Sequence, residues 1–600
     1  MKYFVNSKIY DFIHNNPILM LLILSCAWFL QLEIGNGNDF STFEIVYIIF
    51  DICSILAVTL MLTVLSNSFC FCLVFNFLFL LISVTNYFVV QMRGTPLSTK
   101  DIGNAQTALN VLRSYSFYFG WQFWCILFLF GINCFFFYKI YRKSAGQKKQ
   151  STAQKICLLM ISSIFLYIGY FSPEPVQPSK LLGWSWESAY YKYGYLTVSI
   201  DILGQSFNLI DKPDAYSVEK VENYNDVLKQ YHSIYPSEDF PDIILIVNES
   251  WYDMTQIADY ETNIPVMPFI DNLTGIQYGH AVVPNIGGGT NLTEYEILTG
   301  NSLQLLQGLT PFNVLDLKNA ASIVSILNRN GYDTASLHPA SSTNYNRKSS
   351  YATLGIRNSY WKADFDNWEI EGSHWFYSDK SNFINLMKIY EDMSQNNRSI
   401  FLYNLTIQNH GDYLLNSEDE NIIKILSGMT DNEDKKRMEE YLTCLHKTDE
   451  AFQWLTEYLS QKSNPVVVMM VGDHSPNFVD RIVNKDLSKQ EKLLYEHSTP
   501  FIIWANYELE EKDYGYISSN YLAPLLLDCA RVSSSKYFSW MINDLMDEIP
   551  IITSFNCYVD QSGNYHTYEE NPSGLTEKIN MYFNLEYNNI TEKNQFDYFQ

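Results

Sequence analysis

The sequence predicts two parts with different folds: a multi-pass α-helical membrane domain, followed by an α/β domain with a central, mostly parallel sheet. Two observations support this division. Long apolar runs recur up to residue 170, and each has about the length needed to cross a bilayer as a helix. From residue 241 onward, short apolar runs alternate with helical stretches, a pattern typical of a parallel sheet covered by helices.

The apolar runs predict a five-helix transmembrane domain over residues 1–171. A cleaved signal peptide does not fit, because the pattern repeats without a small-residue cleavage site. Asp51 lies inside the second run. An ionisable residue there is a functional candidate, although a hydrogen bond to a neighbouring helix explains it equally well. The five runs cover residues 17–34, 43–65, 69–90, 117–137 and 156–170.

Lysine and arginine residues predict the orientation of the chain in the membrane. The loop over residues 139–155 carries six of them and no acidic residue, which is typical of a cytoplasmic loop. Lys2 and Lys8 place the N-terminus on the same side. An odd number of spans then puts everything after residue 170 outside the cell, so we expect a cell-membrane protein with an extracellular second part.

The net charge of −25 is distributed unevenly. Residues 1–171 contain eleven Lys and Arg against six Asp and Glu, a net charge of +5, so the remainder carries −30. An acidic exterior argues against nucleic acid as a partner and suits a divalent metal ion. Only Cys444, Cys529 and Cys557 lie beyond the apolar runs, and their spacing supports neither a disulfide framework nor a thiolate zinc site.

Composition also predicts the boundaries after the membrane domain. Residues 172–235 form an interfacial linker with short helices, because the proline-rich stretch SPEPVQPSK is extended and the Trp- and Tyr-rich stretch after it favours the membrane surface. Residues 236–555 form the extracellular catalytic domain. Residues 556–600 form a C-terminal extension.

Four apolar runs of the second part end in residues suited to metal or phosphate chemistry. They lead into Glu249, His338, His410 and the pair Asp473 and His474. Ligands of open α/β sheets bind beyond the carboxyl ends of the strands. Any one of these residues can simply start a turn, but together they favour a single site. His497 is better explained as a residue that supports the ligands, or as a structural residue, than as a ligand itself. The runs cover residues 242–247, 333–337, 400–407 and 465–471.

The stretch NIGGGTNLTEYEILTG over residues 285–300 predicts a phosphate site at a helix start. Three glycines allow close approach of the backbone to a ligand, and their N–H groups with the first helical turn can bind an anion. Thr290 lies where the loop meets the helix. It can alternatively cap that helix, and Thr293 with Glu296 forms an equally good capping box. Two carboxylates, one histidine and a threonine oxygen would suit Mn²⁺, Mg²⁺ or Zn²⁺.

These motifs resemble those of lipoteichoic acid synthase-type phosphoglycerol transferases, membrane-anchored members of the sulfatase and alkaline phosphatase superfamily. The resemblance covers nearly the whole chain and implies a sulfatase-like fold for its second part. Two positions depart from the pattern of the polymer-forming synthases, since Ala340 replaces an aspartate and Tyr345 a tryptophan. The motifs are NESW at 248–251, GGGTNLTEYEILTG at 287–300, HPASSTNYNR at 338–347, NHGDY at 409–413 and GDHSP at 472–476.

The resemblance also implies a role for each matching residue. One metal ion, usually manganese in this family, would be bound by Glu249, Thr290, Asp473 and His474. Thr290 would be the nucleophile as well, and the glycerophosphate group would be held by Arg347, His338 and His410. His410 is also the best candidate for the general acid or base.

The expected function is therefore metal-dependent transfer of glycerophosphate from phosphatidylglycerol to a polyglycerol phosphate chain or an envelope polysaccharide. A sulfatase is disfavoured because Thr290 does not lie in a C/S-x-P-x-R setting. A phosphoethanolamine transferase shares the same metal and threonine chemistry, and a non-catalytic module that binds envelope polymer is the alternative outside the enzymes. Glycosylation sequons at Asn248 and Asn291 would block the site, which favours a bacterial protein, and the resemblance points to a Gram-positive-type envelope.

Overall fold

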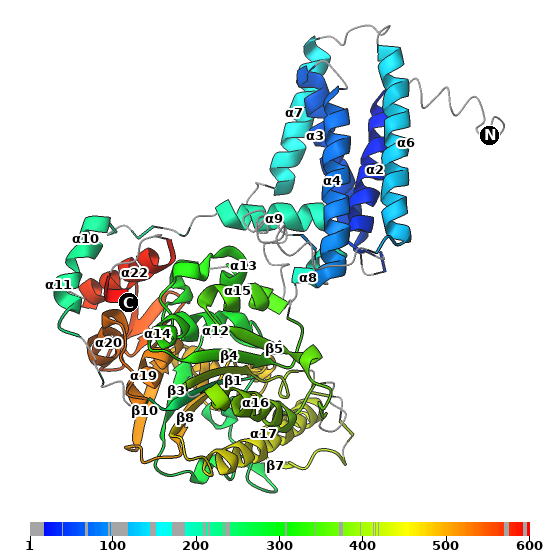
Figure 1. Ribbon diagram of the computed structural model, residues 1–600. Coiled ribbons are helices and arrows are strands. Elements are labelled where there is room, and N and C mark those ends of the chain that lie inside the picture. Colours follow the sequence, from blue (N-terminus) through cyan, green and yellow to red (C-terminus); the bar gives the residue numbers. More distant parts are fainter. Residues whose placement is uncertain are drawn as a thin grey trace. The chain divides into compact units, whose positions relative to one another are not determined.

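The chain divides into two units, residues 1–208 and residues 209–600, and each is described by itself (Figure 1). The proline-rich stretch over residues 172–180 lies outside the part that this computed structural model describes. The described residues are 17–599 except for 39, 42, 67–69, 94–95, 98–117, 145–151, 171–185, 208–209, 211, 214–215, 232–234, 236–239, 307–308, 343, 371–375, 397, 412, 415, 418, 569–574 and 592–596.

Five long helices of the first unit lie where the apolar runs predict them. Helix α2 packs against α3, α4 and α6, and α3 packs against α7. Four described helices are long and apolar enough to cross a membrane, whereas the apolar stretch Leu19–Gly35 of α2 is shorter. The prediction of five membrane spans therefore stays a prediction. The helices are α2 (Pro17–Gly35), α3 (Ile45–Ser66), α4 (Cys70–Arg93), α6 (Trp121–Ser144) and α7 (Thr152–Tyr170).

Two further helices of the first unit, α8 (Trp186–Tyr193) and α9 (Tyr195–Phe207), are joined at Gly194, and buried carboxylates hold the start of α9. Glu33 accepts a hydrogen bond of 2.7 Å from the Tyr195 backbone N–H, and Asp51 accepts one from the Thr197 hydroxyl. Carboxylates are favourable at a helix N-terminus because of the helix dipole. Asp51 thus has a hydrogen-bond partner on a neighbouring helix, one of the two explanations that the sequence left open.

The second unit is built on an eight-stranded sheet with the order β10-β3-β9-β8-β1-β6-β4-β5. Only β9 runs antiparallel to its neighbours, so the sheet is mostly parallel, as predicted. Every residue of β1 is buried, which is typical of a strand covered on both faces. The strands are β1 (Asp242–Asn248), β3 (Gln277–Val282), β4 (Asp333–His338), β5 (Asn358–Trp361), β6 (Ile400–Leu405), β8 (Val466–Gly472), β9 (Ser498–Ala505) and β10 (Lys512–Ser518).

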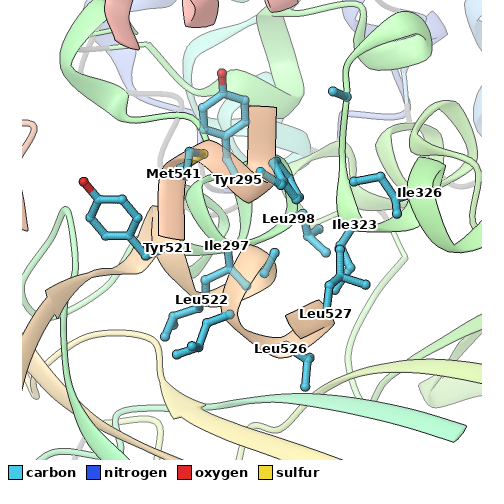
Figure 2. Packing of buried hydrophobic residues seen from close by; sticks show 14 of the residues in the cluster. Tyr295, Ile297, Leu298, Ile323, Ile326, Tyr521, Leu522, Leu526, Leu527 and Met541 are labelled. Carbon is cyan, nitrogen blue, oxygen red and sulfur yellow. The ribbon is translucent and has the colours of Figure 1, made fainter. Parts of the chain in front are cut away.

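Helices cover both faces of this sheet (Figure 1). Alternate residues of β1 enter two different cores: Ile243 and Leu245 belong to the first and Ile244 and Ile246 to the second. The second core is closed by α16 (Asp379–Met393) and α17 (Asn432–Leu459). Figure 2 shows part of the first core. Helices of the first core include α12 (Thr290–Thr299), α14 (Ile323–Arg329), α19 (Leu522–Cys529), α20 (Lys536–Trp540) and α22 (Leu575–Thr591).

The C-terminal extension predicted over residues 556–600 belongs to the second unit. Its helix α22 buries Ile579, Tyr582 and Leu585 in the first core. The boundary after residue 555 stays a prediction. The remaining short elements of this unit are α10 (Val218–Asn223), α11 (Asn225–Leu228), β2 (Glu261–Thr262), α13 (Pro311–Val314), α15 (Arg347–Leu354), β7 (Ile425–Ser427), α18 (Lys489–Glu496), α21 (Met546–Glu548), β11 (Ile551–Ile552), β12 (Cys557–Val559) and β13 (Tyr565–Thr567).

Candidate metal and phosphate site

The register of the central strands brings two carboxylates together. Strands β1 and β8 pair in parallel with Asn248 opposite Gly472, so the residues that follow, Glu249 and Asp473, emerge at the same edge of the sheet. Ser250 then turns the chain with a φ of 48°, and its N–H donates a hydrogen bond of 2.7 Å to Asp473 Oδ1. The positive φ of a residue other than glycine is a strained conformation that is often found at functional sites.

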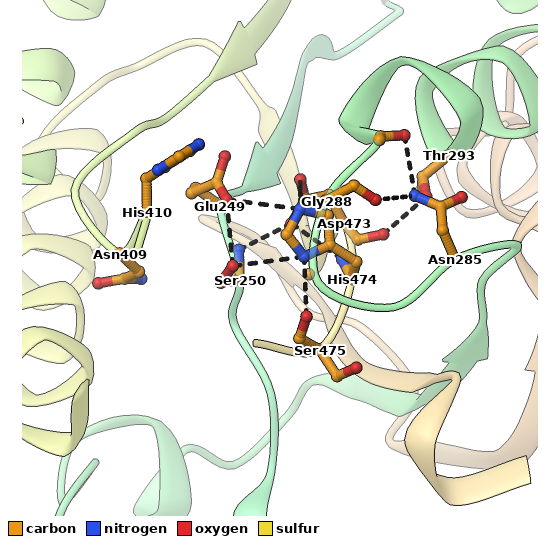
Figure 3. Close-up of polar contacts among 12 residues, drawn as sticks. Glu249, Ser250, Asn285, Gly288, Thr293, Asn409, His410, Asp473, His474 and Ser475 are labelled. Atoms are coloured by element: carbon orange, nitrogen blue, oxygen red, sulfur yellow. Dashed lines mark hydrogen bonds and ion pairs between the residues drawn. The ribbon is translucent and has the colours of Figure 1, made fainter. Parts of the chain in front are cut away.

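His474 completes a group of three possible metal ligands (Figure 3). One ligand atom each from Glu249, Asp473 and His474 lies within 4.8 Å of the others. His474 Nε2 is 3.5 Å from Glu249 Oε1 and 3.2 Å from Asp473 Oδ2. His474 Nδ1 lies 2.9 Å from the Ser475 carbonyl, which can only accept, so Nδ1 carries the proton. The Nε2 lone pair is then directed toward the carboxylates, the usual arrangement of a metal-binding histidine.

The electrostatics of this group fit a divalent cation. All three side chains are buried, and Asp473 Oδ2 has no hydrogen-bond partner among the described residues. Burial raises the pKa of Glu249 to about 8, and the neighbouring charge of Asp473 adds to the increase. Two buried carboxylates this close to each other are costly. A cation bound there would satisfy the free oxygen and offset the repulsion, and two carboxylates with one imidazole are suitable ligands for Mn²⁺, Mg²⁺ or Zn²⁺.

Thr290 is the first residue of α12, and the glycine loop before it is fixed to the metal-ligand segment. Ile286 forms a parallel bridge with Ser475, and the Gly287 N–H donates a hydrogen bond of 2.8 Å to the Ser475 carbonyl. One turn into the helix, the Thr293 hydroxyl donates one of 2.6 Å to the Asp473 carbonyl. The N-terminus of α12 therefore lies beside Asp473, and Thr290 is half-buried.

The helix-capping alternatives considered from the sequence do not occur. The N-cap residue is Gly289, with a φ of 84°, and no side-chain capping hydrogen bond forms. Thr293 is occupied by the Asp473 carbonyl. Glu296 instead accepts a hydrogen bond of 2.9 Å from the Leu303 N–H and another from the Ser519 hydroxyl. No side chain therefore caps the start of α12, although the Leu292 N–H donates a hydrogen bond of 2.8 Å to the Gly289 carbonyl. An uncapped helix start suits an anion site.

Arg347 and His338 form the second group of predicted site residues. His338 ends β4 and Arg347 begins α15, with 3.3 Å between His338 Nε2 and Arg347 Nη1. Burial lowers the pKa of His338 well below its usual value, and the charge of Arg347 lowers it further. His338 is therefore neutral and accepts the hydrogen bond from Arg347. The two residues before Arg347, Tyr345 and Asn346, have φ values of 53° and 59°, so the turn that presents the guanidinium is strained.

Glu294 is a residue of this group that the sequence argument missed. Its Oε1 accepts hydrogen bonds from Arg347 Nε at 2.8 Å and from Nη2 at 2.6 Å. Its Oε2 accepts hydrogen bonds from the hydroxyls of Tyr351 and Tyr403. The signal that could have identified it is its spacing, because residues four apart on a helix share one face and Glu294 follows Thr290 by four positions.

His410 follows strand β6 and is half-buried. Its Nδ1 donates a hydrogen bond of 2.7 Å to the Gly411 carbonyl, which leaves Nε2 available for proton transfer. Its ring centroid is 4.7 Å from that of Phe376. The charge of His410 also contributes to lowering the pKa of His338, so the two histidine side chains lie near each other.

A buried polar network connects the strand ends that carry Glu249 and His410. Asn409 Nδ2 donates to Asn248 Oδ1 at 3.0 Å, and Asn248 Nδ2 donates to Asp379 Oδ2 at 2.9 Å. Thr448 donates a further hydrogen bond of 2.8 Å to Asp379. His497 lies in a different setting, where its Nδ1 donates to the Val283 carbonyl at 2.9 Å, consistent with the structural role suggested by the sequence.

Comparison with known proteins identifies the class of this domain. Residues 241–532 match the sulfatase family model, so this part of the chain is a sulfatase-like domain. A phosphoglycerol transferase from Streptococcus pyogenes, solved in complex with sn-glycerol-1-phosphate, is similar with a TM-score of 0.51 and 21% identity, covering 64% of this chain and 96% of that chain. A lipoteichoic acid synthase from Listeria monocytogenes is similar with a TM-score of 0.43 and 16% identity, covering 62% of this chain and 100% of that chain.

Among the curated proteins, one from Rhizobium meliloti is provisionally named as a cyclic beta-1,2-glucan modification protein. It is 23% identical over 325 residues, which cover 52% of this chain and 49% of that protein. The chain spans about half the length of the curated relatives it matches.

Proposed function

We propose that the protein transfers a glycerophosphate group from a membrane phospholipid, phosphatidylglycerol, to a hydroxyl of a polyglycerol phosphate chain or an envelope polysaccharide. The observation that carries this proposal is the arrangement around α12. Its first residue, Thr290, lies on the turn that contacts Asp473, and one turn later Glu294 holds Arg347. A hydroxyl between a cation site and a guanidinium is suited to attack on a phosphodiester.

In the first half-reaction, Arg347 and the N–H groups at the start of α12 hold the non-bridging phosphoryl oxygens of the donor. The Thr290 oxygen attacks phosphorus and releases its proton to bulk water. The bond from phosphorus to the diacylglycerol oxygen breaks, and His410 supplies the proton to that leaving oxygen. The products are free diacylglycerol and a glycerophosphate group esterified to Thr290.

In the second half-reaction, an acceptor hydroxyl attacks the same phosphorus while His410 removes its proton. The bond from phosphorus to the Thr290 oxygen breaks, and Thr290 regains a proton from bulk water. Ala340 and Tyr345 lie on the segment that presents Arg347, so we place the choice of acceptor there. Transfer of single units and growth of a polymer both follow this chemistry.

Glu249, Asp473 and His474, together with the Thr290 oxygen, would hold one divalent cation, for which we propose Mn²⁺. Such an ion supplies positive charge that favours the ionised threonine oxygen and the phosphoryl oxygens. The orientation predicted from the basic loop and the interfacial linker places this site outside the cell, near lipid headgroups. A membrane phospholipid is a suitable donor there, and the predicted bacterial envelope of Gram-positive type supplies the acceptors.

The test is to incubate the purified full-length protein with Mn²⁺ and fluorescent phosphatidylglycerol. We expect diacylglycerol to be released and a glycerophosphate mass to appear on the peptide that contains Thr290. Thr290→Ala should abolish both signals. Thr299→Ala is the matched control, because Thr299 lies at the other end of α12 and its hydroxyl donates to the Tyr295 carbonyl; it should keep turnover within about twofold.

Other outcomes of this assay lead to other conclusions. Consumption of phosphatidylethanolamine with phosphatidylglycerol left intact would identify a phosphoethanolamine transferase. A protein that binds metal and reacts with neither lipid would contradict lipid-donor catalysis and favour an anchored module that binds envelope polymer.

A further inference from the structure

The geometry points to Glu294 as the positioning residue that aligns the guanidinium of Arg347 with the nucleophile helix. The inference rests on the proposed function, because it concerns how the same site holds a phosphoryl group. Arg347 and Glu294 are both buried, with side chains 3% and 0% exposed. A buried arginine requires a counter-ion, and this one comes from the helix that begins with Thr290.

The hydrogen bonds around Arg347 determine which donors face a substrate. A guanidinium has five N–H groups in a planar fork. Glu294 takes one from Nε and one from Nη2, and the neutral His338 takes one from Nη1. Among the described residues, these contacts leave at most two N–H groups, one on each terminal nitrogen and beside the Tyr351 hydroxyl. Such a pair can bind two phosphoryl oxygens at once.

Glu294 is itself held by groups outside α12. The hydroxyls of Tyr351 and Tyr403 donate to its Oε2. Both tyrosines are fully buried, so the carboxylate is fixed from two further elements, α15 and β6. Thr290 and Glu294 lie four residues apart on one helix, so the ion pair ties the Arg347 guanidinium of α15 to the helix that carries the proposed nucleophile.

The experiment measures binding of inorganic phosphate to the Mn²⁺-loaded full-length protein by isothermal titration calorimetry. Glu294→Gln removes the counter-ion, and Glu294→Asp keeps the charge but withdraws the carboxylate by one methylene group. We expect phosphate affinity to fall about 10-fold to 100-fold in the first variant and less in the second, with Mn²⁺ content unchanged. If Glu294→Gln does not fold, the phosphate affinity of Glu294→Asp still tests the inference.

Glu296→Gln is the matched control, because Glu296 is a second buried glutamate of α12. Its contacts are with Ser519 and Leu303. A purely structural role for buried glutamates would lower phosphate affinity equally in the variants of Glu294 and Glu296. A positioning role predicts that the control matches the wild type.

A double variant shows whether Glu294 affects phosphate affinity through Arg347 or independently of it. If Glu294 acts only through the guanidinium, Glu294→Gln should have no further effect on phosphate affinity in an Arg347→Gln background. Additive losses, or equal affinities in the Glu294 and Glu296 variants, would overturn the inference. The lipid assay decides the proposed function separately, because phosphate binding is measured whether or not a lipid is consumed.

Discussion

Two sets of buried carboxylates are linked to α12, and they are neutralised in different ways. Glu294 has a permanent cation, the Arg347 guanidinium, at 2.6 Å. Glu249 and Asp473 have His474 beside them, and Asp473 Oδ2 lacks a hydrogen-bond partner among the described residues. The first group is complete within the protein, whereas the second becomes complete only with a bound cation. Under the proposed function, the first group would hold the substrate and the second would bind the catalytic cation.

The largest effect should come from removing a ligand of the second group. Asp473→Asn keeps the shape of the side chain but removes its charge, so we expect loss of bound Mn²⁺. Cation stabilisation of a transition state contributes several kcal/mol, which corresponds to a fall in turnover of roughly 10³-fold or more. Metal analysis of the purified variant and the lipid assay measure the two effects. A fully metallated and inactive variant would contradict this account.

Removing the permanent cation should have a smaller effect of a different kind. Arg347→Gln should keep Mn²⁺ bound and reduce kcat/KM for the lipid by about 10²-fold to 10³-fold, because the phosphoryl oxygens lose a bidentate donor. Steady-state kinetics and metal content together distinguish this variant from Asp473→Asn. Loss of Mn²⁺ from Arg347→Gln would show that metal binding depends on Arg347, which would contradict the independence of the two groups.

The difference between the groups also explains what could be predicted from the sequence. Glu249 and Asp473 directly follow apolar runs of adjacent parallel strands, so the rule about strand ends was enough to place them together. Glu294 was missed because its partner, Arg347, is 53 residues away and nothing local links the two. The antiparallel strand β9 and the packing of α22 were missed for the same reason, since both depend on contacts between distant segments.

The pH dependence of metal binding provides a further test of Glu249, Asp473 and His474 as a metal site. The pKa of Glu249 is raised to about 8, so in the metal-free protein this carboxyl is protonated below that pH, and a metal ion must displace the proton. Mn²⁺ affinity should therefore fall by about tenfold per unit as the pH decreases from 8 to 6, and level off above pH 8.

Calorimetric titrations in buffers of different ionisation enthalpy measure both the affinity and the protons released. We expect about one proton per Mn²⁺ at pH 7 from this group. Equal affinities at pH 6 and pH 8 would mean that Glu249 is already ionised without metal. The proposed difference between Glu249, which ionises when metal binds, and Glu294, which is paired with Arg347, would then be contradicted.

The smallest effect on activity should come from a substitution of Glu296. Among the described residues, this buried carboxylate of α12 contacts Leu303 and Ser519 rather than an arginine or the proposed metal ligands. Burial raises its pKa from 4.5 to about 7, against the hydrogen bonds from Ser519 and Leu303 that lower it. Between these two values the folded state binds more protons than the unfolded state, so this group makes stability decrease as the pH rises through that range.

The loss should reach about 3 kcal/mol above pH 7, because each unit of pKa corresponds to about 1.4 kcal/mol. Glu296→Gln cannot ionise, so its melting temperature relative to the wild type should increase between pH 5 and pH 8, while lipid turnover stays within about twofold. Melting curves of the full-length protein at both pH values measure this change. A parallel pH dependence in the two proteins would show that Glu296 stays ionised in the core. α12 would then tolerate a buried charge without a cation, and the unpaired oxygen of Asp473 would no longer argue for a metal ion.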